Sequence, residues 1–166
     1  ATDCSGLEAP IQALRNINVP FTHVFSSETD ADARKFIKEN FDPKVIYQDL
    51  TLRDNRKAES VDIYIAGFPC QPFSLAGVSK KNSLGKSHGF DCKIQGTLFF
   101  EIARILEHHR PKAFLLENVK NLKSHDKGNT FKTILDVLKN KLGYKVQYRV
   151  INAKSYVPQN RQRIYI

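Results

Sequence analysis

The sequence predicts an α/β domain with a mainly parallel sheet and helices on both of its faces. Helix-period and strand-period segments alternate along the whole chain, and no internal repeat or linker interrupts them. The length of 166 residues suits one domain covering residues 1–166, and 41% hydrophobic with 26% charged residues is ordinary for a globular protein. In such sheets ligands bind beyond the carboxyl ends of the strands, so we expect the functional residues to follow the strands.

Each element has its own local signal. Pro10 suits the first turn of a helix with Ile11, Leu14 and Ile17 on one face, and Gly143 is suited to end the last amphipathic helix. Short β-rich runs, such as the one ending at Gly67, predict strands between the helices. We expect helices at about 8–17, 30–40, 98–109 and 131–142, and strands at 24–27, 45–47, 61–66, 113–116, 146–150 and 164–166.

Charge and cysteine content narrow the class of protein. The net charge of +9 favours an anionic partner such as nucleic acid. The three cysteines show no CxxC spacing, which argues against a disulfide framework and a zinc ribbon, so we expect a reducing compartment and no metal site. No apolar run is long enough to span a bilayer. We therefore expect a soluble intracellular protein with no membrane partner.

A cysteine flanked by two prolines follows the strand at 61–66. Cys70 lies between Pro69 and Pro72, in the run Gly-Phe-Pro-Cys-Gln-Pro-Phe-Ser. The prolines stiffen the loop, and a thiol presented by such a loop is a candidate nucleophile. A lone cysteine is more often a buried structural residue, and the surrounding octapeptide is the reason to prefer the functional interpretation.

That octapeptide resembles the catalytic motif of the cytosine-C5 DNA methyltransferases. Three further segments resemble motifs of the same family in the same order: Gly96-Thr97-Leu98-Phe99, Glu117-Asn118-Val119, and Gln159-Asn160-Arg161-Gln162-Arg163. The resemblance implies a Rossmann-like S-adenosylmethionine-dependent methyltransferase fold. It also implies methyl transfer to C5 of cytosine in double-stranded DNA, with the target cytosine flipped out of the helix.

The resemblance assigns the catalytic roles. Cys70 would add to C6 of the cytosine as a thiolate, and Glu117, directly after the strand at 113–116, would hydrogen-bond N3. Arg161 and Arg163 would hold the flipped nucleotide and orient Glu117. The other substrate-binding candidates are Gln71, Ser74, Asn118 and Gln159, with Lys80 and Lys81 of the loop at 79–93 placed to meet phosphate. A solvated loop explains those lysines about equally well.

The cofactor residues follow the first strands. The family motif Phe-x-Gly-x-Gly-Gly is replaced by Cys4-Ser5-Gly6-Leu7-Glu8-Ala9, so adenine packing is expected to be weaker, and Glu8 is expected to narrow the pocket or pair with the cofactor's ammonium group. Glu28 would bind the ribose hydroxyls, and Asp49 with Leu50 would contact adenine. The candidates for binding S-adenosylmethionine and its product S-adenosylhomocysteine are Ser5, Gly6, Leu7, Glu28, Thr29, Asp49, Leu50, Pro69 and Leu98.

Several alternatives stay open. The motifs end at Arg163, with no sign of a recognition domain, so we expect a truncated catalytic domain or one subunit of a split enzyme. A tRNA cytosine-C5 methyltransferase and a catalytically silent cofactor- or partner-binding fragment are the competing functions. Gly67-Phe68 before Pro69 and Ser74 after Phe73 favour DNA over tRNA. The setting, whether a prokaryotic cytoplasm with a restriction–modification role or a nucleus, is left open.

Overall fold

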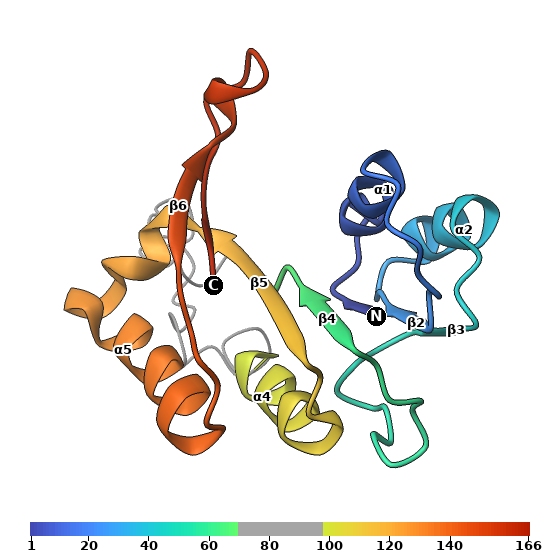
Figure 1. The fold of residues 1–166 in the computed structure, drawn as a ribbon, viewed down its shortest axis with the longest axis horizontal. Coiled ribbons are helices and arrows are strands. Elements are labelled where there is room, and N and C mark those ends of the chain that lie inside the picture. The colour runs from blue at the N-terminus through green and yellow to red at the C-terminus, as the bar shows by residue number, and fades with distance from the viewer. Residues whose placement is uncertain (70–97) are drawn as a thin grey trace, which may run out of the picture. The chain divides into compact units, whose positions relative to one another are not determined.

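A computed structural model describes residues 1–69 and 98–166 and divides the chain into two compact units (Figure 1). Unit 1 consists of Ala1–Gly67 with His108–Leu115, and unit 2 consists of Phe68–Glu107 with Leu116–Ile166. The predicted sites at Cys70, Gln71, Ser74, Lys80 and Lys81 lie outside the described residues. Among the described residues, none of the helices has the length and apolar character needed to cross a membrane.

Unit 1 is built on parallel strands connected by helices. Its elements are β1 (Thr2–Asp3), α1 (Ala9–Asn16), β2 (Phe25–Ser27), α2 (Ala31–Asn40), β3 (Val45–Tyr47) and β4 (Ile63–Ala66). The strands lie in the order β3-β2-β1-β4, and every pairing among them is parallel. The carboxyl ends of β1, β2 and β3 therefore lie at one edge of the sheet.

Helices α1 and α2 pack against the strands of unit 1 through buried apolar side chains. Asp30 caps α2, its carboxylate accepting a hydrogen bond from the amide of Ala33 at 2.8 Å, which satisfies one free donor of the first turn. Ile11 of α1 and Ile37 of α2 are buried together with Phe41, with Ile46 of β3 packed against them. Each helix thus buries one apolar residue, whereas Ile17 and Phe36, which the periodicity also placed on apolar faces, are exposed.

Unit 2 combines helices with antiparallel strands. Its elements include most of α4 (Leu98–His109) and of β5 (Ala113–Val119), followed by the short turns η2 (Lys120–Lys123) and η3 (His125–Gly128). The chain continues through α5 (Asn129–Asp136), the π-helical turn η4 (Val137–Lys141), β6 (Arg149–Asn152), η5 (Ala153–Ser155) and β7 (Gln162–Tyr165). β7 pairs antiparallel with both β5 and β6.

The antiparallel strands modify the predicted sheet. The expectation of a mainly parallel sheet holds for unit 1, whereas the pairings β5–β7 and β6–β7 of unit 2 are antiparallel. The strand expected at 146–150 forms at Arg149–Asn152, and the one expected at 113–116 extends to Val119. Both shifts follow the pairing with β7, which sets strand limits that local sequence does not encode.

Candidate functional site

Glu117 and the two candidate arginines meet on one face of the β5–β7 pair. Glu117 lies opposite Tyr165, and Val119 lies opposite Arg163, so Glu117 and Arg163 are diagonal neighbours with side chains on the same face. Arg163 Nε lies 2.9 Å from Glu117 Oε1, and Arg161 Nη2 lies 4.0 Å from the same oxygen. Both guanidinium groups therefore approach Oε1 of the carboxylate.

The position of Glu117 in its strand differs from the prediction. We expected it just after a strand ending at residue 116, but it lies inside β5, which continues through Val119. Pairing with β7 extends β5 beyond the apolar run and fixes Glu117 on a rigid strand. Its side chain is 30% exposed, so it remains reachable while its backbone is held in the sheet.

Asn118 points to the opposite face and is fully buried. Its Nδ2 donates a hydrogen bond to the carbonyl of Phe68 at 3.2 Å, and its Oδ1 accepts one from the amide of Val119 at 2.8 Å. The first of these bonds ties β5 to Phe68, and the next residue, Pro69, is half-buried. Asn118 was expected to bind substrate; its burial instead gives it a role in fixing the backbone that leads to Cys70.

The remaining substrate candidate among the described residues, Gln159, lies in the exposed turn between β6 and β7. Its amide donates to the carbonyl of Val157 at 2.7 Å, and its carbonyl accepts from the amide of Arg161 at 3.0 Å. Gln159 therefore shapes the turn through its backbone. Leu98, the cofactor candidate that begins α4, is partly buried.

In unit 1, the loop after β1 is bound tightly to β2. The amide of Ser5 donates to the carbonyl of Ser27 at 3.1 Å, and the amide of Ser27 donates to Ser5 Oγ at 3.2 Å. Gly6 follows with φ +53, a left-handed conformation that glycine adopts without steric cost. Leu7 is 61% exposed. The buried Ser5 side chain thus fixes the loop, leaving Gly6 and Leu7 at its surface.

Glu28, at the end of β2, reaches across to this loop. Its Oε2 accepts a hydrogen bond from the amide of Gly6 at 2.7 Å, and its Oε1 accepts one from the amide of Asp30 at 3.0 Å. The hydroxyl of Thr29 lies 3.5 Å from Oε1. The structure therefore brings Gly6, Glu28 and Thr29 together, as the cofactor prediction requires.

Asp49 and Leu50 follow β3 in the same way. Asp49 Oδ1 accepts hydrogen bonds from the amide and the hydroxyl of Thr51 at 2.8 and 2.7 Å, and Leu50 is buried. Burial, followed by the charges of Asp3, Glu28 and Asp49, raises the pKa of the Cys4 thiol to about 12. Cys4 is therefore a neutral thiol between carboxylates from three strand ends. Carboxylate acceptors suit the ribose hydroxyls and the amino group of an adenosine, so this set of acceptors fits the expected cofactor.

Glu8 does not lie where the sequence analysis expected it. Its carboxyl is completely buried, and Oε1 accepts hydrogen bonds from the hydroxyls of Thr2 and Ser26, with His23 Nε2 at 3.5 Å. Burial raises the pKa of Glu8 and lowers that of His23 to about 4. Glu8 therefore stabilises the inside of unit 1, and the expectation that it narrows the pocket or pairs with the cofactor's ammonium group is wrong.

A buried ion pair below the cofactor loop was missed from the sequence. Arg53 donates to both carboxylate oxygens of Asp3, from Nη1 at 2.8 Å and from Nη2 at 2.7 Å, and Nη1 also donates to Ser27 Oγ at 2.8 Å. Tyr64 Oη donates to Asp3 Oδ2 at 2.6 Å. The Arg53 guanidinium also lies 4.5 Å from the centre of the Phe25 ring. The polar segment around Arg53 looks like an ordinary surface loop, so no local signal identifies this contact.

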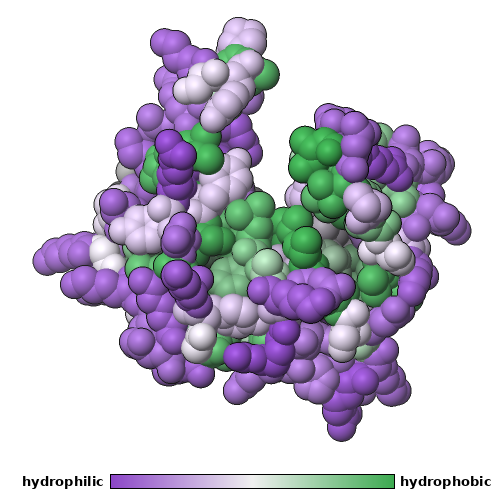
Figure 2. Space-filling view, viewed as in Figure 1, coloured by the Kyte–Doolittle hydropathy of each residue, from purple (hydrophilic) through white to green (hydrophobic). Residues whose placement is uncertain are grey.

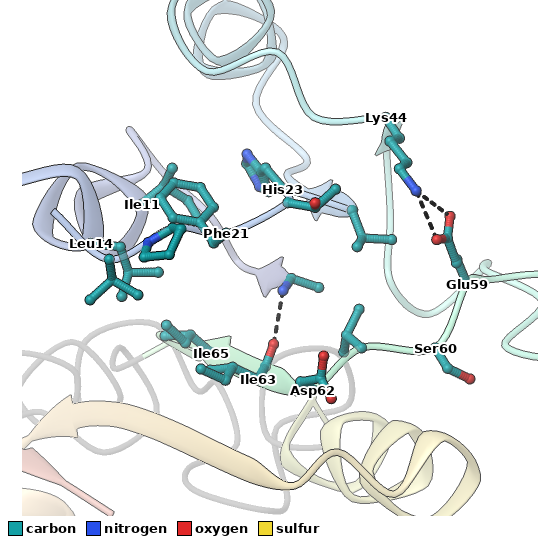
Figure 3. A pocket seen from close by; sticks show the side chains of 16 residues that line it. Ile11, Leu14, Phe21, His23, Lys44, Glu59, Ser60, Asp62, Ile63 and Ile65 are labelled. Atoms are coloured by element: carbon teal, nitrogen blue, oxygen red, sulfur yellow. Dashed lines mark hydrogen bonds and ion pairs between the residues drawn. The ribbon is translucent and has the colours of Figure 1, made fainter.

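A pocket of about 690 Å³ lies at the other edge of unit 1 (Figure 3). Its lining includes Ala1, Val24, Lys44 and Asp62, which precede β1 to β4, so it is at the amino ends of the strands. Ile11, Leu14 and Phe21 face Ile63 and Ile65 across it. The cofactor candidates of unit 1 follow the carboxyl ends and lie outside this lining. In the part of the chain that is described, no group of His, Cys, Asp or Glu is arranged to hold a metal ion.

Residues 4–166 match the family model described as C-5 cytosine-specific DNA methylase. Over 172 positions the chain is 45% identical to a DNA-cytosine methyltransferase of Escherichia coli K12, covering 86% of this chain and 36% of that protein. It is 51% identical over 147 positions to the type II methyltransferase M.HpaII of Haemophilus parainfluenzae, covering 86% of this chain and 38% of that protein.

Solved structures agree on the fold. Dnmt2 methyltransferase of S. pombe superposes with a TM-score of 0.70 at 18% identity, over 99% of this chain and 46% of that chain. A putative DNA modification methyltransferase encoded within an E. coli prophage gives 0.71 at 20% identity, over 99% and 44%. This likeness confirms the predicted Rossmann-like methyltransferase fold. The chain spans less than half the length of each of these proteins.

Proposed function

The chain belongs to the C-5 cytosine-specific DNA methylase family, and on that premise we propose that it carries the catalytic and cofactor residues of a DNA cytosine-C5 methyltransferase. The substrate is double-stranded DNA with the target cytosine flipped out of the stack, and the methyl donor is S-adenosylmethionine. The curated relatives are much longer than this chain. Recognition of a target sequence is then supplied outside these residues, by a further segment or a second subunit.

The arrangement of Glu117 with Arg163 supports this proposal most directly. Arg163 Nε contacts Glu117 Oε1 at 2.9 Å, and Arg161 approaches the same oxygen. With Oε1 held by arginine, Oε2 is left to carry a proton and to donate it in a hydrogen bond to N3 of cytosine. Arg161, whose side chain is 51% exposed, is available for the phosphate or carbonyl edge of the same nucleotide.

The roles of the residues follow from the weak nucleophilicity of cytosine C5. The Cys70 thiolate adds to C6, and the carboxyl of Glu117 at N3 neutralises the negative charge that develops on the ring. C5 then takes the methyl group that S-adenosylmethionine supplies. A base removes the C5 proton, the C6–S bond breaks, and the thiolate of Cys70 is regenerated. Asn118 holds the carbonyl of Phe68 and so positions the segment before Cys70.

Unit 1 provides the acceptors for the methyl donor. Glu28, fixed by the amide of Gly6, lies at the end of β2 and binds the ribose hydroxyls. Asp49 at the end of β3 binds the adenine amino group. Leu7, exposed on the loop after β1, packs on the cofactor. Glu8 takes no part, because its carboxyl is enclosed by Thr2 and Ser26.

Covalent trapping tests the assignment. The protein is incubated with S-adenosylmethionine and a duplex in which every cytosine is 5-fluorocytosine, because fluorine at C5 cannot leave as a proton and the adduct accumulates. Cys70→Ser should abolish the adduct, while Cys92→Ser, a change of the same kind in the same chain, should not. Glu117→Gln should slow trapping by roughly 100-fold or more. Trapping that persists in Cys70→Ser would refute the proposed nucleophile.

A further inference from the structure

The turn that joins β6 to β7 is a rigid structure with an exposed tyrosine. The amides of Tyr156 and Val157 both donate to the carbonyl of Ala153, at 2.8 and 2.9 Å. Asn152 Oδ1 accepts from the amide of Arg161 at 3.1 Å, closing the base of the turn. Despite this order, the Tyr156 side chain is 79% exposed and Val157 is 50% exposed. The hydrogen-bonded backbone of the turn therefore holds the Tyr156 ring and the Val157 methyl groups in solvent.

The surroundings of Tyr156 favour an anionic partner. Between residues 137 and 166 the sequence contains lysines and arginines but neither aspartate nor glutamate. Lys154 is in the turn itself, and Arg161 and Arg163 line a pocket of about 290 Å³ together with Tyr156, Tyr165 and Ile151. The end of the β6–β7 hairpin accordingly mixes hydrophilic with pale and hydrophobic side chains (Figure 2). Aromatic rings beside cations are the chemistry that binds nucleic acid bases and phosphates.

This pocket adjoins the catalytic carboxylate. Arg161 and Arg163, which form one wall, are the same residues that approach Glu117 Oε1. A cytosine flipped toward Glu117 leaves its neighbours in the DNA stack with an uncovered face, and covering that face offsets part of the unstacking cost. Tyr156 is the large exposed aromatic side chain of the turn beside Arg161.

We propose that the turn at 153–161 is a second DNA contact, in which the ring of Tyr156 stacks on a base beside the flipped cytosine while Lys154 and Arg161 lie against the phosphates. The inference rests on the proposed function, because it assumes a flipped target. It goes beyond the catalytic assignment by naming a residue that touches the rest of the duplex. Val157, next to Tyr156, extends the exposed apolar surface of this turn.

The test measures fluorescence anisotropy of the protein with a duplex that contains a mismatched cytosine flanked by 2-aminopurine. Tyr156→Ala should weaken binding by roughly 5- to 100-fold, the range for loss of one base–aromatic stack. The 2-aminopurine fluorescence should change when the unchanged protein binds and stacks on this base, and Tyr156→Ala should abolish that change. Tyr156→Phe keeps the ring and should bind within about twofold of the unchanged protein. Lys154→Gln should instead reduce the slope of affinity against salt by about one, the signature of a lost phosphate contact.

The possible outcomes separate this inference from the proposed function. Equal binding by Tyr156→Ala and the unchanged protein overturns the inference, and so does an equal loss in Tyr156→Phe or a failure of the unchanged protein to bind the duplex at low salt. If 5-fluorocytosine trapping fails while the dependence on the Tyr156 ring persists, the proposed chemistry is overturned and the DNA contact stands.

Discussion

Replacing Arg53 should destabilise unit 1 more than any change in the surrounding loop. In Arg53→Met, the carboxylate of Asp3 loses its two hydrogen bonds from Nη1 and Nη2 and keeps the one from the Tyr64 hydroxyl. The side chains of Arg53 and Asp3 are both 0% exposed, so water does not replace the lost partner. Removing one partner of a buried ion pair costs about 3–5 kcal/mol, mainly because the other charge stays buried without compensation.

The assay is urea unfolding followed by circular dichroism. With a slope of about 2 kcal/mol per molar urea, a loss of about 4 kcal/mol lowers the midpoint by about 2 M. Arg53→Lys keeps the charge but cannot reproduce the bidentate contact together with the bond to Ser27, so it should be intermediate. Arg56→Met is the matched control, because Arg56 is ion-paired with Asp54 at an exposed position on the same segment and its loss should leave the midpoint unchanged.

A double-mutant cycle distinguishes an ion-pair effect from simple packing. The double variant Asp3→Asn/Arg53→Met leaves neither charge of this ion pair buried. It should therefore lose less free energy of unfolding than the sum of the two single variants, by up to about 3 kcal/mol. Additive single effects, or a midpoint in Arg53→Met equal to that of Arg56→Met, would refute the reasoning.

Three further outcomes follow from the geometry of unit 1. Burial lowers the pKa of His23 to about 4, so as pH falls from 6.5 toward 4 the unfolded chain binds a proton at His23 before the folded protein does, and the free energy of unfolding should drop by up to about 3 kcal/mol. His23→Gln should reduce the pH dependence of the urea midpoint over this range. An unchanged pH dependence in this variant would contradict the assignment. Calorimetric titration with S-adenosylhomocysteine should show Glu28→Gln binding roughly 10-fold more weakly, the effect of one lost contact of about 1.4 kcal/mol. Asp32→Asn, which changes an exposed carboxylate on α2, is the comparison and should bind as the unchanged protein does. Equal affinity in Glu28→Gln would place the cofactor elsewhere. Cys4, whose pKa is raised to about 12, should resist iodoacetamide at pH 8 in the folded protein and react in urea, with mass spectrometry of the Cys4 peptide as the readout, and rapid alkylation without urea would show that the thiol is not protected.

The sequence predicted most helices and strands of unit 1, because capping residues and short β-rich runs within each segment determine them. The helix at 30–40 begins at its Asp30 cap, and the strand at 45–47 forms with the bounds expected. Parallel strands joined by helices bring successive strand ends to one edge, and this is the edge at which the family resemblance places Glu28 and Asp49. Asp3 and Arg53, whose ion pair is buried in unit 1, are far apart in sequence. Nothing in the sequence around either residue predicts that the two pair.

Unit 2 shows the limit of the same reasoning. The apolar run at 113–116 predicts a strand, but the continuation through Val119 depends on pairing with β7, more than forty residues later in the chain. That pairing decides which face each residue occupies. It turns Glu117 toward Arg163 and Asn118 into the interior, so one motif places a carboxylate beside an arginine and a buried amide on the carbonyl of Phe68.

Glu8 illustrates how a departure from a family motif is compensated by distant residues. Its φ of 58 is in the left-handed region, where a side chain costs roughly 1–2 kcal/mol relative to glycine. Glycine would avoid that cost, but it could not accept the hydrogen bonds from Thr2 and Ser26, which join β1 to β2 beneath the loop that carries Gly6. The same loop holds the Gly6 amide against Glu28 at 2.7 Å. Glutamate at this position therefore replaces backbone freedom with a side-chain network that joins the first two strands of unit 1.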